Sequence, residues 1–360
     1  MSGLFTSNTQ CGAQQFTLTG VVAILFWFAF AQFAQASEQG DTRCLKARIP
    51  QIIAHRGASA YYPEHTLAAY QAAAEIAADY IEPDLVVTKD GVLIARHDNY
   101  LSSSTDVAQH KAFASKKRLN PQSNRTDWWV EDFTLAEIKQ LRAKQPFPGR
   151  SDVYDGQFQI PTFREILQWV NKHNTGNEKP LGIYPEIKQP TYLKSIALDP
   201  VPLLIADLES MGFNHKEARV FIQSFDPRVF APLREKTPLP LVLLLAPDAE
   251  GNPMFDIRDF SDLISAIGPY KGLLIGSNGS STGLLDLAHK LNLLVHPWTF
   301  RNDQLPEHIN DPLQEYRIFY QLGVDAVFTD FPDTALKART VFMGTEGLKQ
   351  TDNGCDEKNN

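Results

Sequence analysis

The sequence predicts an α/β fold in which eight strand–helix units form a barrel, with a small insertion after the second strand. The chain has 360 residues, 43% of them hydrophobic and 21% charged, which is an ordinary globular composition. From Gln51 onward, short apolar runs alternate with segments of helical periodicity. This alternation predicts a parallel sheet, and about eight repeats favour a closed (β/α)8 barrel over an open sheet.

The predicted strands are short apolar runs, and the predicted helices carry apolar residues three or four positions apart. The strands are residues 51–54, 80–88, 181–187, 219–223, 239–245, 272–275, 293–296 and 326–329. The helices include residues 65–78, 162–173, 201–211 and 284–291. In the first of these, Leu67, Tyr70, Ala74 and Ala77 share one face.

Residues 99–160 break this rhythm, because they are polar and contain no clear strand. Insertions after barrel strands often lie over the active-site face, so we expect a lid or a substrate-binding cap. We expect Trp128 and Trp129 to pack the insertion on the barrel. Contact with a head group or a membrane surface is the alternative for these two side chains.

Residues 1–36 contain no Asp, Glu, Lys or Arg. Residues 21–31 form an apolar run of 11 residues, shorter than the roughly 20 that span a bilayer. Ala34, Gln35 and Ala36 follow as an A-x-A processing site, which predicts a signal peptide with cleavage before Ser37 and a periplasmic or secreted protein. The run lacks a preceding basic residue, and a buried N-terminal helix is the alternative.

The remaining chain divides into the barrel, residues 37–344, and a polar tail, residues 345–360, that we expect to be flexible. Cys44 and Cys355 lie near opposite ends of this chain, so an oxidising compartment could join them; two free thiols are the alternative. The net charge of −8 gives a nucleic acid no general attraction.

Charged residues gather at the ends of the predicted strands. Glu82 and Asp84 are two positions apart, as are Glu186 and Lys188, so each pair projects from one face of its strand. Three carboxylates in one lumen repel one another unless a cation lies among them. Oxygen ligands predict a hard divalent ion, Ca²⁺ or Mg²⁺, rather than zinc.

Two histidines near this cluster titrate close to neutrality. His55 follows the first strand and His97 ends the extension of the second. One could take a proton from a nucleophile while the other protonates a leaving oxygen. Arg56 and Lys188 add fixed positive charge that suits a phosphate. Together these groups predict cleavage of a phosphodiester.

Six ordered motifs resemble those of glycerophosphodiester phosphodiesterases, above all the periplasmic bacterial type. They are HRGASAYYPEHT (55–66), EPDLVVTKDG (82–91), HD (97–98), YPEIK (184–188), HPWT (296–299) and GVDAVFTDFPD (323–333). The likeness covers residues 52–340. It implies a TIM barrel with a small insertion after the second strand, and hydrolysis of glycerophosphodiesters such as glycerophosphocholine and glycerophosphoethanolamine to sn-glycerol 3-phosphate and an alcohol.

The resemblance also implies a role for each matching residue. The metal ligands are Glu82, Asp84 and Glu186, the acid/base pair is His55 and His97, the phosphate contacts are Arg56 and Lys188, and the supporting glutamate is Glu64. Ca²⁺ is the usual ion of the periplasmic type, and Mg²⁺ is the alternative. In the family's mechanism a glycerol hydroxyl attacks phosphorus to give a cyclic phosphate, which water opens. We assign His55 as base and His97 as acid, although the second step exchanges these roles.

Pro83 departs from the family pattern, and we expect only a local effect with metal binding retained. Trp298 could form a wall for the glycerol or pack in the barrel, and Gln223 and Phe225 are similar cases. Asp330 and Asp333 are expected to cap the last helix. The remaining histidines match no catalytic motif and are expected in surface or core roles; they are His65, His110, His173, His215, His289 and His308.

Two other functions compete with this interpretation. A phosphodiesterase that cleaves intact phospholipids would need an apolar rim or an interfacial helix, and the sequence shows neither such a helix nor a basic face. A silent barrel that captures glycerophosphodiesters would have no need of two histidines. The sequence leaves the preferred alcohol and the oligomeric state open, and it predicts no stable membrane span.

Overall fold

The computed structural model describes residues 49–276 and 279–352. The predicted signal peptide, Cys44 and Cys355 lie outside these residues, so the export and pairing predictions remain predictions. Among the described residues, none of the helices is long and apolar enough to cross a membrane.

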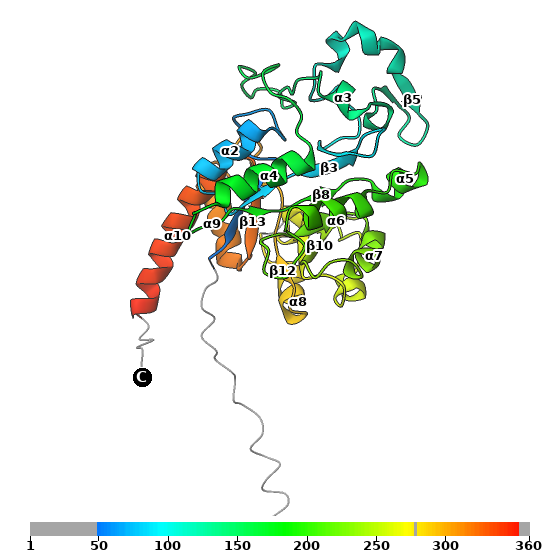
Figure 1. The fold of residues 1–360 in the computed structure, drawn as a ribbon. Helices are drawn as coiled ribbons and strands as arrows, with labels where there is room; N and C mark the ends of the chain where they lie inside the picture. Colours follow the sequence, from blue (N-terminus) through cyan, green and yellow to red (C-terminus); the bar gives the residue numbers. More distant parts are fainter. Residues whose placement is uncertain (1–48, 277–278, 353–360) are drawn as a thin grey trace, which may run out of the picture. The chain divides into compact units, whose positions relative to one another are not determined.

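Eight parallel strands form a TIM barrel, which confirms the predicted fold class (Figure 1). In chain order they are β1 (Gln51–His55), β2 (Tyr80–Glu82) continued by β3 (Asp84–Val87), β7 (Gly182–Ile183) continued by β8 (Glu186–Ile187), β9 (Ile222–Ser224), β10 (Leu241–Leu245), β11 (Ala266–Pro269), β12 (Leu294–Val295) and β13 (Ala326–Thr329). Parallel bridges from Phe300 to Thr329 and from Ile183 to Val220 close the barrel.

Two barrel strands are interrupted by proline, which has no N–H for the ladder. Pro83 separates β2 from β3, and Pro185 precedes β8. The ladder continues at both points, because the Pro83 carbonyl accepts from the Glu186 N–H at 2.9 Å and the Pro185 carbonyl accepts from the Gln223 N–H at 2.9 Å. The effect of Pro83 is therefore local, as the sequence predicts.

Helices follow most strands and surround the barrel (Figure 1). They are α2 (Leu67–Glu75), α4 (Phe163–Asn174), α5 (Pro190–Ser195), α6 (Pro200–Ser210), α7 (Phe230–Arg234), α8 (Leu284–Lys290), α9 (Pro312–Leu322) and α10 (Pro332–Asp352). Thr162 and Glu165 start α4 with a capping box, which satisfies two free backbone N–H groups. Because α10 continues to Asp352, the tail that the sequence predicts from Thr345 begins inside a helix.

The predicted sixth strand is wrong in position. Residues 271–273 form a 3₁₀ turn, and the strand is β11, which comes earlier in the chain. Its sequence, Ala-Ile-Gly-Pro, contains two residues that usually argue against a strand. Gly268 allows close packing there, because a Cβ at this position would lie 2.5 Å from Leu244 Cδ2 and would displace that side chain.

The expected extension of the second strand is β4 (Leu93–Ala95), which pairs with β3 in antiparallel orientation. The insertion has more structure than the sequence predicts, because a hairpin of β5 (Arg118–Asn120) and β6 (Arg125–Asp127) precedes the short helix α3 (Leu135–Ile138) (Figure 1). These strands have only three residues each, too short to leave a periodic signal. Trp128 and Trp129 are buried, and their indole N–H groups donate to backbone carbonyls, so they are packing residues.

Candidate active site

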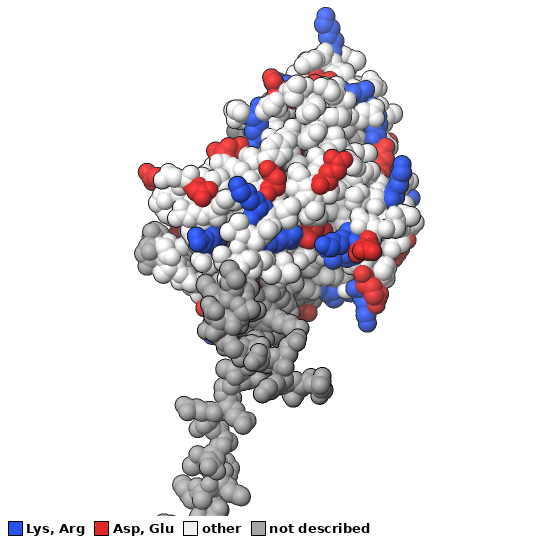
Figure 2. All heavy atoms as spheres, turned by 90° about the vertical axis from the view of Figure 1, so that its left-hand side faces the viewer, with Lys and Arg blue, Asp and Glu red and all other residues white. Residues whose placement is uncertain are grey.

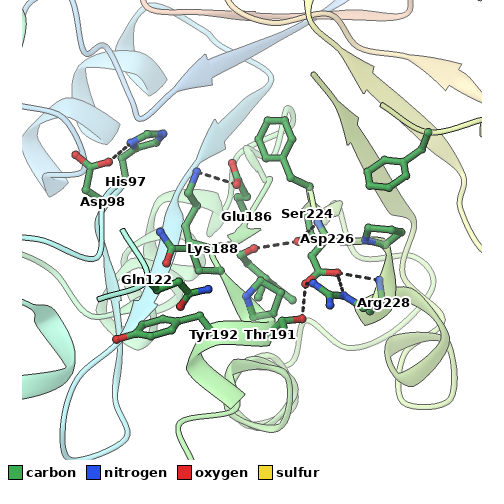
Figure 3. A pocket seen from close by; sticks show the side chains of 16 residues that line it. His97, Asp98, Gln122, Glu186, Lys188, Thr191, Tyr192, Ser224, Asp226 and Arg228 are labelled. Carbon is green, nitrogen blue, oxygen red and sulfur yellow. Dashed lines mark hydrogen bonds and ion pairs between the residues drawn. The ribbon is translucent and has the colours of Figure 1, made fainter. Parts of the chain in front are cut away.

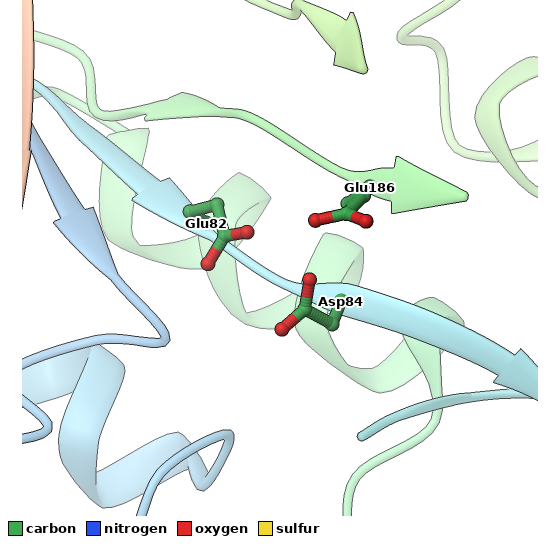
Figure 4. Close-up of side chains that lie close together, drawn as sticks. All are labelled: Glu82, Asp84 and Glu186. Atoms are coloured by element: carbon green, nitrogen blue, oxygen red, sulfur yellow. The ribbon is translucent and has the colours of Figure 1, made fainter. Parts of the chain in front are cut away.

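Three carboxylates meet at the carboxyl ends of neighbouring strands. Glu82 and Asp84 flank Pro83, and Asp84 is the register partner of Glu186 on β8. Each of the three offers an oxygen within 4.8 Å of the others, and all three side chains are buried (Figure 4). The structure thus brings together the three predicted metal ligands.

The carboxylates of this triad have unequal surroundings. Burial raises the pKa of Glu82 well above its ordinary value, and the neighbouring Asp84 and Glu186 add to the rise. Burial also raises the pKa of Glu186 to about 8, against the effect of Lys188. For Asp84 burial acts in the same direction, but Lys188 and His65 outweigh it and hold the pKa well below its usual range.

The triad fits a hard divalent cation. Lys188 Nζ lies 2.8 Å from Glu186 Oε1 and 3.7 Å from Asp84 Oδ1. Asp84 Oδ1 is nevertheless buried without a hydrogen-bond donor. The donor set consists of carboxylate oxygens, the ligands that Ca²⁺ and Mg²⁺ prefer. A cation here would relieve the repulsion that raises the pKa values of the two glutamates.

Arg56 connects the triad to a supporting carboxylate. Its backbone N–H donates to Glu82 Oε2 at 2.8 Å, and its guanidinium contacts Asp84 Oδ2 at 3.4 Å and Glu64 Oε2 at 2.8 Å. Glu64 is buried, and although burial favours its neutral form, Arg56 holds its pKa at about 2. The next residue must be Gly57, because a Cβ there would lie 2.7 Å from the Ala69 backbone.

His55 is held by a carboxylate whose role the sequence does not predict. Its Nδ1 lies 2.6 Å from Asp330 Oδ1, and the other Asp330 oxygen accepts from Arg150 and Arg301, each at 2.7 Å. A proton on Nδ1 would leave the lone pair of Nε2 free to act as a base. Burial and then Arg56 lower the pKa of His55 to about 4, in spite of Asp330. The imidazole is therefore neutral at pH 7.

The prediction that Asp330 caps the last helix is wrong, because its carboxylate serves His55 and two arginines instead. Asp333 is the second residue of α10, and its carboxylate accepts from the Tyr61 hydroxyl at 2.8 Å. A signal for Asp330 existed in its position directly after the last strand, since such ends carry the functional side chains of TIM barrels. Arg150 comes from the insertion and carried no such signal.

His97 follows β4, and its Nδ1 lies 2.9 Å from Asp98 Oδ1. Burial lowers its pKa, and the charges of Arg56 and Lys188 act in the same direction. Each of the two histidines predicted to be catalytic thus has its own carboxylate partner.

Further groups support the site from several strands. Gln223 Nε2 donates to Glu82 Oε1 at 3.0 Å, and His65 Nε2 lies 2.9 Å from Asp84 Oδ2. The default core role of His65 is therefore correct, but it lies against a predicted metal ligand. The Trp298 indole donates to the Gly268 carbonyl at 2.7 Å and meets Phe225 edge to face, with ring centroids 5.5 Å apart.

Two cavities meet at these groups. The inner cavity measures about 110 Å³ and contains His55, Arg56, Glu82 and Trp298 among its lining residues. The outer cavity measures about 800 Å³ and is lined by residues such as Gln122, Thr191, Tyr192, Asp226 and Arg228 (Figure 3). His97, Glu186, Lys188 and Phe225 border both. Figure 2 shows acidic and basic side chains interspersed on one face of the molecule, not gathered into a basic surface.

A TIM barrel with this site defines a class of enzyme. Buried carboxylates suited to a divalent ion, two histidines and two cations surround one small cavity. These are the elements of a metal-dependent phosphodiester hydrolase.

Comparisons with known proteins identify the family. Residues 55–334 match the glycerophosphoryl diester phosphodiesterase family. A glycerophosphodiester phosphodiesterase of Arabidopsis thaliana is 34% identical over 320 residues, which cover 80% of this chain and 85% of the relative. One of Haemophilus influenzae is 31% identical over 350 residues, covering 84% and 93%. The chain belongs to this family and is an enzyme that hydrolyses glycerophosphodiesters.

Solved structures share the fold. A crystal structure of a protein from Silicibacter pomeroyi, described as a glycerophosphoryl diester phosphodiesterase, superimposes with a TM-score of 0.64 at 22% identity, covering 82% of this chain and 95% of that one. A phosphodiesterase from Oleispira antarctica, solved with the product sn-glycerol-3-phosphate, gives a TM-score of 0.59 at 21% identity, covering 81% and 96%.

Proposed function

We propose that the enzyme hydrolyses soluble glycerophosphodiesters, such as glycerophosphocholine and glycerophosphoethanolamine, to sn-glycerol 3-phosphate and an alcohol, with the glycerol half in the inner cavity. One observation carries this assignment. The neutral His55, held by Asp330 at 2.6 Å, lines the same 110 Å³ cavity as Glu82, Glu186, Arg56 and Lys188. A base thus lies beside the groups that would bind the phosphate.

In the proposed reaction, Arg56 and Lys188 bind the phosphate oxygens. His55 Nε2 takes the proton of the glycerol hydroxyl next to the phosphate, and that oxygen forms a bond to phosphorus. The bond from phosphorus to the alcohol oxygen breaks, and His97 in its protonated form gives this oxygen a proton and becomes neutral. Water then opens the cyclic phosphate, with His97 as base and His55 as acid.

Glu82, Asp84 and Glu186 would hold one divalent ion, which supplies positive charge to the phosphate in the transition state. We propose Ca²⁺ in preference to Mg²⁺. The three carboxylates can bind Ca²⁺ in a flexible geometry, whereas Mg²⁺ demands a near-ideal octahedron.

We also propose that the enzyme is of the periplasmic bacterial type and is exported after cleavage before Ser37. The uncharged residues 1–36, the apolar run and the A-x-A site support this. N-terminal sequencing of the protein recovered outside the cytoplasm tests it. An intact Met1 end on that protein would contradict export by this signal.

Release of glycerol 3-phosphate from glycerophosphocholine by the purified enzyme tests the reaction and the ion together. We expect the activity to vanish with EDTA and to return with Ca²⁺, and to a smaller extent with Mg²⁺. Phosphatidylcholine vesicles should not be cleaved. Cleavage of vesicles, or no hydrolysis of any soluble diester by the folded enzyme, would favour the lipid-cleaving or the binding alternative.

A further inference from the structure

The proposed reaction gives no role to the outer cavity, although this cavity borders the site. Its volume of about 800 Å³ lies within the range of roughly 300–1,000 Å³ typical of small-molecule sites. His97 and Lys188 border both cavities. A phosphate bound at Lys188 would therefore have one cavity on each side.

The inner cavity, about 110 Å³ in volume, has room for little more than the small glycerol half. The alcohol must then leave the phosphate on the side of His97, the residue proposed to protonate it. We infer that the outer cavity binds the alcohol half of the substrate, and that the Asp226–Arg228 ion pair keeps this cavity neutral, so that neutral and cationic alcohols both fit. This inference rests on the proposed function.

The charged side chains that line the outer cavity lie in contact in pairs. Arg228 Nε and Nη2 lie 2.7 and 2.9 Å from the two Asp226 oxygens, and the Thr191 hydroxyl donates to Asp226 at 2.5 Å (Figure 3). Lys188 pairs with Glu186, and Asp98 with His97. Each of these charged side chains thus has a partner, and the Asp226–Arg228 pair in particular adds no net charge to the lining.

The rest of the lining offers apolar contact. Phe225, Phe255, Pro190 and Pro227 contribute carbon surface to the outer cavity. Phe225 is 36% exposed although it is a large aromatic residue beside the catalytic groups. Aromatic faces attract alkyl groups and also quaternary ammonium groups. Such a lining favours contact with the alkyl part of many alcohols over recognition of one charged group.

The chain contains a matched control for the ion pair. Asp226 precedes the 3₁₀ turn η4 (Pro227–Val229), and Asp256 precedes η5 (Ile257–Phe260). In both, the aspartate accepts the N–H of an arginine two residues later, at 3.1 and 3.0 Å, and pairs with its guanidinium. The Asp226 pair lines the outer cavity, whereas Asp256 and Arg258 are not among its lining residues.

The test compares Arg228→Gln and Arg228→Glu with Arg258→Gln and Arg258→Glu. For each variant, kcat/KM is measured with glycerophosphocholine, whose alcohol is cationic, and with glycerophosphoglycerol, whose alcohol is neutral. Without Arg228, Asp226 becomes an unpaired negative charge. We expect Arg228→Gln to raise the choline-to-glycerol ratio roughly fivefold at low salt. Arg228→Glu should raise it further, and 1 M NaCl should remove most of the change.

The Arg258 variants should keep the ratio of the unaltered enzyme. If both Arg228 variants still hydrolyse the diesters but keep a choline-to-glycerol ratio within twofold of that value, the inference is overturned and the proposed function is not. An equal shift in the Arg258 variants would also overturn it, because the effect would then be one of general surface charge. Failure of the unaltered enzyme to hydrolyse either diester would overturn the proposed function, and this inference with it.

Discussion

The inner and outer cavities share a border but are built differently. In the inner cavity His55 and Arg56 are buried, and a buried carboxylate holds each of them: Asp330 holds His55, and Glu64 holds Arg56. In the outer cavity, exposed side chains such as Arg228 and Phe225 take part in the wall. Buried networks thus fix the proposed base and a proposed phosphate contact in place, whereas the wall proposed to meet the alcohol can vary with little cost to the fold.

The largest effect is expected from substitutions in the carboxylate triad. Glu82→Gln removes a charge that the proposed ion requires, so we expect loss of most Ca²⁺ affinity and a fall in activity at low Ca²⁺ of at least about 10³-fold, with partial recovery at high Ca²⁺. Calorimetric titration with Ca²⁺ and the release of glycerol 3-phosphate measure the two effects. Glu315→Gln is the matched control, since Glu315 is equally buried but pairs with Lys271 at 2.6 Å.

The Glu315 variant should lose stability and keep Ca²⁺ binding. If Glu82→Gln binds Ca²⁺ as tightly as the unaltered enzyme does, the triad is not the metal site.

The second prediction concerns the two histidines and the carboxylate that orients one of them. We expect His55→Ala and His97→Ala to lower kcat by about 10²- to 10⁴-fold with Ca²⁺ affinity retained. Asp330→Asn should approach the effect of His55→Ala, because an amide can donate to Nδ1 and shift the imidazole proton to Nε2. Single-turnover rates with glycerophosphocholine provide the measurement.

Glu217→Gln is the control for this substitution, since His215 and Glu217 form an exposed pair at 3.2 Å. Near-normal turnover of Asp330→Asn would show that Asp330 does not orient the base, and near-normal turnover of His97→Ala would remove it as the acid.

The third prediction follows from the raised pKa values in the triad. Burial raises the pKa of Glu186 to about 8, so below pH 8 the carboxyl group is protonated and an arriving ion must displace the proton. Apparent Ca²⁺ affinity should therefore fall as pH falls, by about tenfold per pH unit for each proton displaced. Titrations at pH 6, 7 and 8 in buffers of different ionisation enthalpy would reveal the proton release. An affinity that stays constant from pH 6 to pH 8 would contradict it.

The smallest effect is expected in the outer cavity. Gln122 is the contribution of the insertion hairpin to this wall and is exposed. We expect Gln122→Ala to change kcat/KM for glycerophosphoglycerol by no more than about threefold, which is typical of exposed substitutions. Steady-state kinetics with this diester checks it. A hundredfold loss of kcat/KM would contradict the view that the outer cavity tolerates substitution.

Much of the fold and of the site could be predicted from the sequence. Hydrophobic periodicity located seven of the eight barrel strands, and spacing by two placed Glu82 with Asp84 on one side of the sheet. The position of strand β11 was not predicted, because Gly268 and Pro269 have low strand propensity. Gly268 allows close packing against Leu244, and Pro269 is the last residue of the strand. The hairpin strands of the insertion are too short to show a hydrophobic periodicity.

The missed site contacts are long-range. Asp330 lies 275 positions from His55, and Arg150 lies 180 positions from Asp330. Only barrel closure, which sets β13 beside β1, brings Asp330 to the histidine. A local pattern of Asp before a helix predicts a cap, and burial of the carboxylate among two arginines and a histidine overrides it.

The most direct test of the account uses a substrate without the attacking hydroxyl. In 3-hydroxypropyl phosphocholine the carbon next to the phosphate-bearing one carries no hydroxyl, so the hydroxyl that His55 is proposed to activate is absent and a five-membered cyclic phosphate cannot form. We expect this analogue to inhibit glycerophosphocholine hydrolysis competitively and to release choline more slowly than glycerophosphocholine by at least about 10³-fold. Release of choline from this analogue within tenfold of the rate for glycerophosphocholine would contradict attack by the glycerol hydroxyl, and with it the proposed role of the inner cavity.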